Sequence, residues 1–162
     1  MTHLDNLKNG ESDIRCDRLT IGSAIITGSA EETFQIGYRF GQTITAPCIL
    51  AFYGDLGAGK TTFIRGIASA VTADAQEVCS PTFTYLNIYH GTTRIYHFDL
   101  YRIPTEQEFI AAGFDEYLHA GGICCIEWPE KISSILTGQT LPTLFRVCIA
   151  HAGEGLREIK VL

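Results

Sequence analysis

Apolar runs alternate with helically spaced apolar residues through the middle of the chain. Residues 47–53 form an apolar run without alternation, which is typical of a central strand covered on both faces. Residues 60–72 carry apolar side chains at every third or fourth position, which predicts a helix with one buried stripe. Ser29 followed by Glu32 matches a capping box and predicts that a helix occupies residues 30–42.

Shorter apolar segments predict the remaining secondary structure. Further strands are expected at residues 19–27, 83–89, 94–101, 122–127, 144–150 and 156–162. Short helices are expected at residues 105–112, 114–119 and 130–136. The polar stretch Gly91–Thr93 lies between two of the strands and is typical of a β-hairpin turn.

Length and composition fit one globular core. The chain has 162 residues, of which 46% are hydrophobic and 19% charged. The polar beginning predicts an N-terminal arm over residues 1–20, ahead of a folded domain over residues 21–162. The longest apolar run, Cys48–Tyr53, is far shorter than the roughly 20 residues that a membrane-spanning helix needs, and the N-terminus has no apolar signal region. We therefore expect a cytoplasmic protein without a membrane partner.

Charge and cysteine content disfavour two further classes of protein. The 12 Lys and Arg residues against 18 Asp and Glu residues give a net charge of −6, whereas a surface that binds nucleic acid directly needs a positive field. The six cysteines contain no C-x-x-C pair and no metal-like grouping with histidine, so they are interpreted as reduced thiols.

The clearest chemical motif is Gly54–Thr61, which reads GDLGAGKT and matches G-x-x-x-x-G-K-[ST]. It lies between a predicted buried strand and a predicted helix, where glycine amides and a helix N-terminus can bind phosphates. Lys60 would neutralise the β- and γ-phosphates, and the Thr61 hydroxyl would bind Mg²⁺. The alternative is a glycine-rich turn without a ligand. The motif and the predicted elements together indicate an α/β fold: a single-domain P-loop NTPase with a mainly parallel sheet flanked by helices and a small antiparallel extension.

Two acids end predicted strands, where a ligand of an open α/β sheet would lie. Asp99 follows an apolar stretch, and Glu127 ends Ile123–Glu127 in the manner of a Walker B element. Both are candidates to hold the metal and position water, and the alternative is a solvated strand-end carboxylate. The segment Ser80–Thr82 is placed where P-loop enzymes often carry a nucleotide-sensing switch, with a proline turn as its alternative.

Four spaced motifs resemble those of the TsaE (YjeE) family, the ATPase that assists threonylcarbamoyl-adenosine modification of tRNA. They are GDLGAGKTT (54–62), SPTFTYLNIY (80–89), HFDLYRI (97–103) and IEWPEK (126–131). The resemblance implies ATP and Mg²⁺ as cofactors, weak hydrolysis in isolation, and a complex with the TsaB and TsaD proteins, of which TsaD carries the transfer chemistry. Because the chain has a net charge of −6, we expect it to meet tRNA only indirectly, within that complex.

The resemblance also assigns residues by motif position. Lys60, Asp99, Glu127 and Thr82 become the catalytic set, with Thr82 as the switch threonine, and Thr61, Asp99 and Glu127 become the metal-binding set. The nucleotide-binding set comprises the phosphate loop, the tryptophan after the Walker-B-like acid, and the opening helix and tail: Gly54, Asp55, Leu56, Gly57, Ala58, Gly59, Lys60, Thr61, Thr62, Trp128, Ser29, Thr33 and Arg157. Trp128 is expected over the nucleotide pocket, with core packing as the alternative.

The expected function is therefore that of an ATP-binding, slowly hydrolysing accessory protein of tRNA N6-threonylcarbamoyladenosine modification. A small P-loop metabolite kinase is the alternative, but it would need basic lid residues, and residues 105–122 contain no Lys or Arg. A nucleotide-gated binding module with negligible turnover is a third possibility. His97 shares a strand face with Asp99 and is interpreted as a core or partner-contacting histidine rather than a catalytic one.

Overall fold

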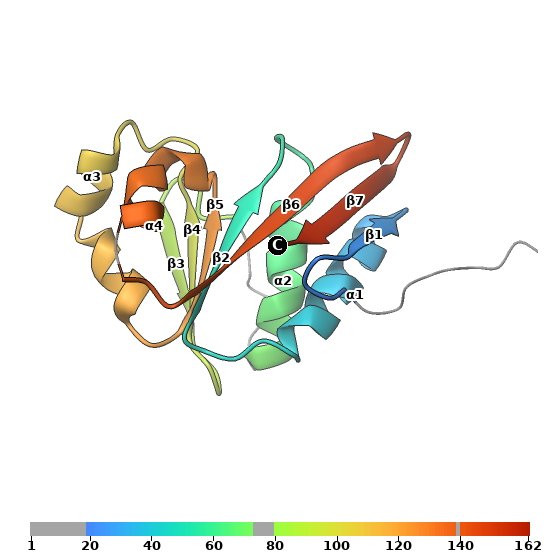
Figure 1. Cartoon of the computed structure of the whole chain (residues 1–162), viewed down its shortest axis with the longest axis horizontal. Coiled ribbons are helices and arrows are strands. Elements are labelled where there is room, and N and C mark those ends of the chain that lie inside the picture. The colour runs from blue at the N-terminus through green and yellow to red at the C-terminus, as the bar shows by residue number, and fades with distance from the viewer. Residues whose placement is uncertain (1–18, 73–79, 139) are drawn as a thin grey trace, which may run out of the picture.

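Seven strands form one sheet in the residues described by this computed structural model, which are 19–72, 80–138 and 140–162. The strand order is β1-β7-β6-β2-β5-β4-β3 (Figure 1). The strands are β1 (Ala24–Thr27), β2 (Cys48–Tyr53), β3 (Leu86–Tyr89), β4 (Ile95–Asp99), β5 (Ile123–Glu127), β6 (Thr143–Gly153) and β7 (Leu156–Val161).

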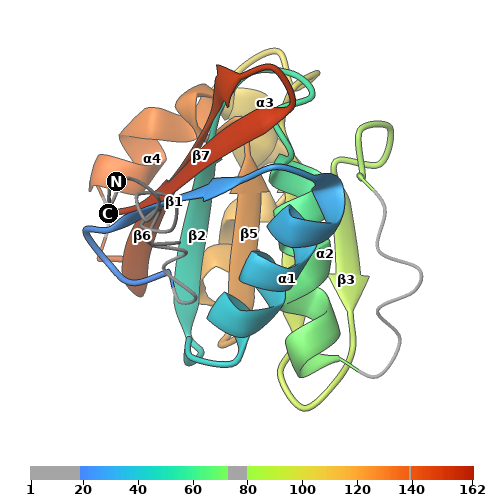
Figure 2. The ribbon, with the colours of Figure 1, turned by 90° about the vertical axis from the view of Figure 1, so that its right-hand side faces the viewer.

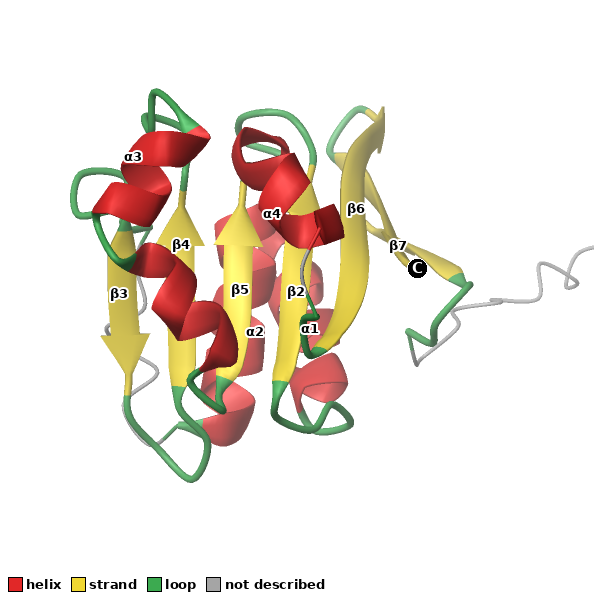
Figure 3. Cartoon of the chain, turned by 60° about the vertical axis from the view of Figure 1, so that its left-hand side comes forward, coloured by secondary structure: helices red, strands yellow, loops and turns green. Residues whose placement is uncertain are grey.

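Helices cover both faces of the sheet. Figure 2 shows α1 (Ala30–Gly41) and α2 (Lys60–Val71) side by side on one face. Figure 3 shows α3 (Glu106–Ala111) and α4 (Ser133–Gly138) on the other face. Two 3₁₀ helices, η2 (Phe114–His119) and η3 (Pro129–Ile132), complete that second layer. None of the described helices is long and apolar enough to cross a membrane.

Strand β2 confirms the prediction of a central strand buried on both sides. Its residues Cys48, Leu50 and Phe52 pack with α1 and α2, while Ile49 and Ala51 pack into the core formed with the second helical layer. Because alternate strand residues face opposite sides, one apolar run supplies both cores.

The N-cap predicted for the first helix is present, and the reciprocal hydrogen bond of the capping box is made one residue earlier, at Gly28 instead of Ser29. Ser29 accepts a hydrogen bond from the Glu32 amide at 3.1 Å, and the Glu32 carboxylate accepts one from the Gly28 amide at 2.8 Å. The box fixes the beginning of α1 beside β1.

The sheet is mixed rather than mainly parallel. Its four central strands, β6, β2, β5 and β4, pair in parallel, whereas β1 with β7, β7 with β6, and β3 with β4 pair antiparallel. Short connections between consecutive strands produce the antiparallel pairs β3–β4 and β6–β7, whereas β1 and β7 come from opposite ends of the described sheet's sequence and pair without such a connection. The antiparallel part is therefore larger than the small extension expected from sequence.

Several predicted element boundaries are wrong by a few residues. The strand expected from residue 83 begins at Leu86, because the amides of Thr84 and Tyr85 both donate to the Pro81 carbonyl and close a turn. The strand expected up to residue 101 ends at Asp99. The first strand is shorter than expected, and the arm predicted for residues 1–20 lies outside the described residues except for positions 19 and 20.

Two glycines allow α1 and α2 to pack backbone against backbone. A Cβ atom at Gly37 would lie 2.3 Å from the Phe63 carbonyl oxygen, and one at Gly66 would lie 2.2 Å from the Phe34 carbonyl oxygen. No larger side chain fits at these crossing points, so the pair fixes the position of α2.

Replacing Gly66 with alanine should destabilise the fold. Although alanine favours helix more than glycine does, its methyl group would force the backbones of α1 and α2 apart. We expect a loss of about 2 kcal/mol or more, seen as a melting temperature lower by roughly 4–8 °C. Gly138→Ala is the matched control, because a Cβ there meets nothing within 4 Å and should leave the melting temperature close to the parental value. Equal melting temperatures for the two variants would contradict the close packing.

Candidate functional site

The glycine-rich loop 54–59 connects the end of β2 to the beginning of α2. Gly54, Gly57 and Gly59 have φ angles of +145°, +76° and +107°, which side chains with a Cβ rarely adopt. At Gly54 a Cβ would also lie 2.2 Å from the Ile149 carbonyl oxygen of β6. The loop therefore adopts a backbone conformation in which its amide groups and the N-terminus of α2 can approach an anion.

Lys60 lies across this loop. Its Nζ atom donates to the carbonyl oxygens of Gly54 at 2.7 Å and Asp55 at 2.9 Å, and it lies 4.2 Å from the centroid of the Trp128 ring. Burial lowers the pKa of Lys60, and the nearby carboxylates of Glu127 and Asp99 partly oppose that shift. The amine is thus held inside the site by partners that an anion could replace.

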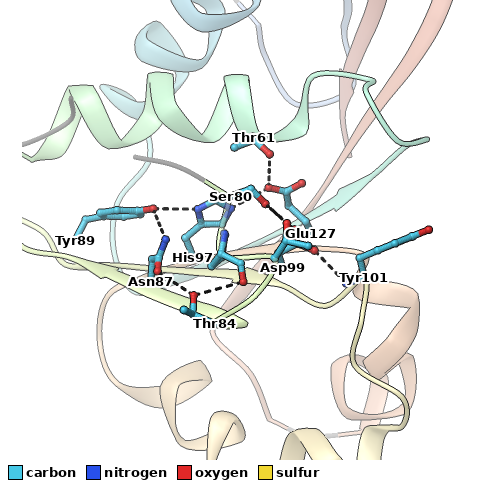
Figure 4. A network of polar contacts seen from close by, with 11 residues as sticks. Thr61, Ser80, Thr84, Asn87, Tyr89, His97, Asp99, Tyr101 and Glu127 are labelled. Atoms are coloured by element: carbon cyan, nitrogen blue, oxygen red, sulfur yellow. Dashed lines mark hydrogen bonds and ion pairs between the residues drawn. The ribbon is translucent and has the colours of Figure 1, made fainter. Parts of the chain in front are cut away.

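The two strand-end acids lie next to each other because β4 and β5 pair in parallel. Asp99 is opposite Glu127 in the register, so both carboxylates leave the sheet at its carboxyl edge. Thr61, in the first turn of α2, donates its hydroxyl to Glu127 Oε1 at 2.7 Å (Figure 4). This bond joins the loop end of α2 to a strand 66 residues away along the chain.

Asp99 accepts hydrogen bonds from the hydroxyl groups of two residues in the segment 80–82. Ser80 and Thr82 each donate to Asp99 Oδ2 at 2.6 Å, and the Tyr101 amide donates to Oδ1 at 3.0 Å. Burial raises the pKa of Asp99, but these hydrogen bonds outweigh it and leave the pKa below its ordinary value. Asp99 is therefore an ionised acceptor at neutral pH that ties Thr82 to the site.

Trp128 follows Glu127 with a left-handed backbone, φ 61°, and precedes Pro129 of η3. Its half-buried ring packs against the core on one side, and its centroid lies 5.0 Å from that of Tyr101. The ring also lines the hollow beside Lys60. Trp128 therefore lies partly in the wall of the hollow and partly against the core, the two environments that the sequence analysis considered for it.

Two hollows lie on either side of the glycine-rich loop. The larger, about 340 Å³, is lined by Leu56, Gly57, Gly59, Lys60, Thr61, Thr62, Ser80, Thr82, Asp99, Tyr101, Glu127 and Trp128. The smaller, about 130 Å³, is lined by Ser29, Ala30, Thr33, Gly57, Ala58, Gly59, Thr62, Gly155 and Arg157. The residues assigned from sequence all line one of these hollows except Gly54 and Asp55, whose carbonyl groups hold Lys60.

The larger hollow has features that the sequence did not assign to a site. Tyr101 is not among the site residues assigned from sequence, yet it lines the hollow and its amide donates a hydrogen bond to Asp99. His97 is fully buried, as expected of a core histidine, but its Nε2 atom lies 2.9 Å from Glu127 Oε1. In the sequence, His97 and Asp99 are two residues apart and so share one face of a strand, which places His97 near the site. That spacing does not reveal its contact with Glu127 on β5.

The oxygen groups in the larger hollow fit Mg²⁺. No group of three or more His, Cys, Asp or Glu side chains able to hold a metal occurs in the described parts of the chain. Two carboxylates and a threonine hydroxyl suit Mg²⁺, because this ion is usually held by one or two carboxylates, waters and substrate phosphates.

Known proteins resemble this chain over most of its length. The family model described as threonylcarbamoyl adenosine biosynthesis protein TsaE matches residues 27–159. The tRNA threonylcarbamoyladenosine biosynthesis protein TsaE of Treponema pallidum is 35% identical over 136 residues, which cover 84% of this chain and 97% of that protein. The protein of the same name from a Nostoc species is 32% identical over 152 residues, covering 90% of each chain.

A solved structure has the same fold. The crystal structure of Bacillus subtilis YdiB has a TM-score of 0.64 to this chain at 33% identity, and covers 85% of this chain and 82% of its own. Sequence and fold agree over the same large part of the molecule, and the chain belongs to the TsaE family of tRNA threonylcarbamoyladenosine biosynthesis proteins.

Proposed function

We propose that this protein is a P-loop ATPase that binds Mg·ATP beside residues 54–62 and hydrolyses it slowly. The observation that carries the proposal is the 2.7 Å hydrogen bond between Thr61 Oγ1 and Glu127 Oε1. It joins the hydroxyl that follows a glycine-rich loop to a buried strand-end acid. This is the pair of groups that a phosphate-bound magnesium ion requires.

Each group in the larger hollow has a role in this proposal. The loop amides and the N-terminus of α2 bind the phosphates, and Lys60 exchanges its carbonyl partners for phosphate oxygens. Thr61, Asp99 and Glu127 hold Mg²⁺, which when bound neutralises charge on the β- and γ-phosphates. Ser29, Thr33 and Arg157 reach the nucleotide from the smaller hollow.

Nucleotide binding is coupled to the segment 80–82 through Asp99. The hydroxyl groups of Ser80 and Thr82 occupy the same Asp99 oxygen at 2.6 Å. A cation at that carboxylate competes with them, so its arrival changes how Thr82 is held. This exchange gives the protein a nucleotide-dependent surface with which to reset a larger assembly.

The assembly is the tRNA threonylcarbamoyladenosine modification complex, in which the protein acts with TsaB and TsaD in the cytoplasm. Family membership supports this role over that of a metabolite kinase. The net charge of −6 favours contact with tRNA only through the partners.

Lys60→Ala should abolish productive use of Mg·ATP while the protein remains folded. The substitution removes the cation that neutralises the phosphates, so we expect turnover in the presence of TsaB and TsaD to fall about 10²-fold or more. ATP hydrolysis and nucleotide affinity are measured together with thermal melting. Lys160→Ala, an exposed lysine on β7, is the control. Parental affinity and turnover in Lys60→Ala would contradict the phosphate-loop assignment.

Asp99→Asn and Glu127→Gln should each lower turnover about 10²-fold or more, because a neutral amide is a poor ligand for Mg²⁺. Nucleotide affinity should change less than the rate. Steady-state hydrolysis over a range of Mg²⁺ concentrations checks this, with the exposed acid Glu116→Gln as the control. A variant that hydrolyses ATP at the parental rate identifies its residue as a strand-end carboxylate without a role in the reaction.

The fluorescence of the single tryptophan should respond directly to nucleotide binding. Trp128 lies 4.2 Å from Lys60 Nζ and lines the larger hollow, so a polyphosphate changes the charge beside the indole. We expect the emission spectrum to shift with Mg·ATP, to shift differently with Mg·ADP, and not to respond in Lys60→Ala. An unchanged spectrum at concentrations where calorimetry detects binding would remove Trp128 from the site.

A further inference from the structure

Glu127 is held by two side chains from different elements. Its Oε1 atom accepts from Thr61 Oγ1 at 2.7 Å and lies 2.9 Å from His97 Nε2 (Figure 4). Glu127 is 4% exposed and His97 is fully buried, on neighbouring parallel strands. In the register His97 is opposite Cys125, so the contact with Glu127 is a diagonal one across two strands.

Both contacts use Oε1, so the second carboxylate oxygen of Glu127, Oε2, can face the hollow. A carboxylate oxygen has two lone pairs, and Oε1 uses both. Oε2 takes part in none of the hydrogen bonds of Glu127, and no buried side-chain oxygen or nitrogen of the described residues lacks a partner. Oε2 is therefore in contact with the hollow that Glu127 lines, beside Lys60 and Thr61.

The hydrogen-bond directions around His97 are consistent with one arrangement. To donate to a carboxylate, Nε2 must carry the proton, and Nδ1 can then accept from the Tyr89 hydroxyl at 3.4 Å. The Tyr89 oxygen in turn accepts from Asn87 Nδ2 at 3.3 Å. Strand β3 thus orients the imidazole of β4, and the imidazole orients the acid of β5.

We propose that His97 is a positioning residue for Glu127, and that it keeps Oε1 on Thr61 and turns Oε2 toward the nucleotide. This inference rests on the proposed role of Glu127 in holding Mg²⁺. Removing a buried residue that orients a metal-binding side chain typically lowers metal affinity or activity 10–100-fold. Because His97 has no exposed surface, it does not touch the nucleotide itself.

The first test compares two substitutions at this position. His97→Phe keeps a planar ring but removes the donor to Glu127, whereas His97→Gln keeps an N–H group near the position of Nε2. We expect His97→Phe to lower kcat about 10–100-fold with a KM for ATP near the parental value, and His97→Gln to recover most of that loss. Melting curves of both variants test whether the fold is retained. Equal kcat values in the two folded variants, or a loss confined to KM, would overturn the proposal.

A double-variant cycle identifies the acid as the route of the effect. If His97 acts through Glu127, adding His97→Phe to Glu127→Gln should cost much less than it does alone. Additive losses would instead show that His97 acts through another group. A parental protein without ATP turnover would refute the proposed function, and the next measurement then decides the role of His97 by itself.

Proton NMR of the protein labelled with ¹⁵N-histidine tests the contact without any nucleotide. We expect a slowly exchanging Nε2–H resonance that disappears in His97→Gln and moves in Glu127→Gln. Variants of Glu116, an exposed acid, should leave it unchanged. A proton found only on Nδ1, or a resonance indifferent to Glu127→Gln, would overturn the proposal even in a protein that hydrolyses ATP.

Discussion

The hydrogen bond from Thr61 to Glu127 joins the two parts of the fold on which the site depends. Thr61 is positioned by α2, and α2 is fixed against α1 by the close contacts at Gly37 and Gly66. Glu127 is positioned by β5, which pairs in parallel with β2 and places Phe52 opposite Glu127. A shift of either element would separate two atoms that lie 2.7 Å apart. The Thr61–Glu127 hydrogen bond therefore depends both on the packing of α1 against α2 and on the register of β5 against β2.

Charges removed from water require partners, and the site supplies them from its own chain. Lys60 has two backbone carbonyls and an aromatic face, and Asp99 has two hydroxyl groups and an amide. In the proposed function, these partners belong to segments that the nucleotide also contacts. Binding is then an exchange of partners, which avoids leaving any charge uncompensated, and it links the ligand to the positions of the loop and of residues 80–82.

The sequence could predict the parts of the site that depend on local pattern. The apolar run of β2, the glycines after it and the acids at two strand ends are readable because period and spacing are properties of neighbouring residues. The partner of His97 and the place of Tyr101 depend on the register of β4 against β5, which no local pattern contains. The hairpin between β3 and β4 was predicted, but the extent of the antiparallel part was underestimated, since the periodicity of a strand does not reveal the direction of its neighbour.

Backbone strain is concentrated beside the two acids. Among the described residues other than glycine, positive φ angles occur at Tyr85 and Trp128, with values of 63° and 61°. The Tyr85 carbonyl accepts from the Asp99 amide at 3.1 Å, and Trp128 directly follows Glu127. Such conformations cost on the order of 1–3 kcal/mol and persist only where the surroundings determine them. Here the Tyr85 ring packs on Phe114, and the Trp128 ring packs on Tyr101. Packing on η2 of the second helical layer therefore stabilises the turn beside Asp99, whereas the turn beside Glu127 is stabilised by contact with Tyr101, in the turn that follows β4.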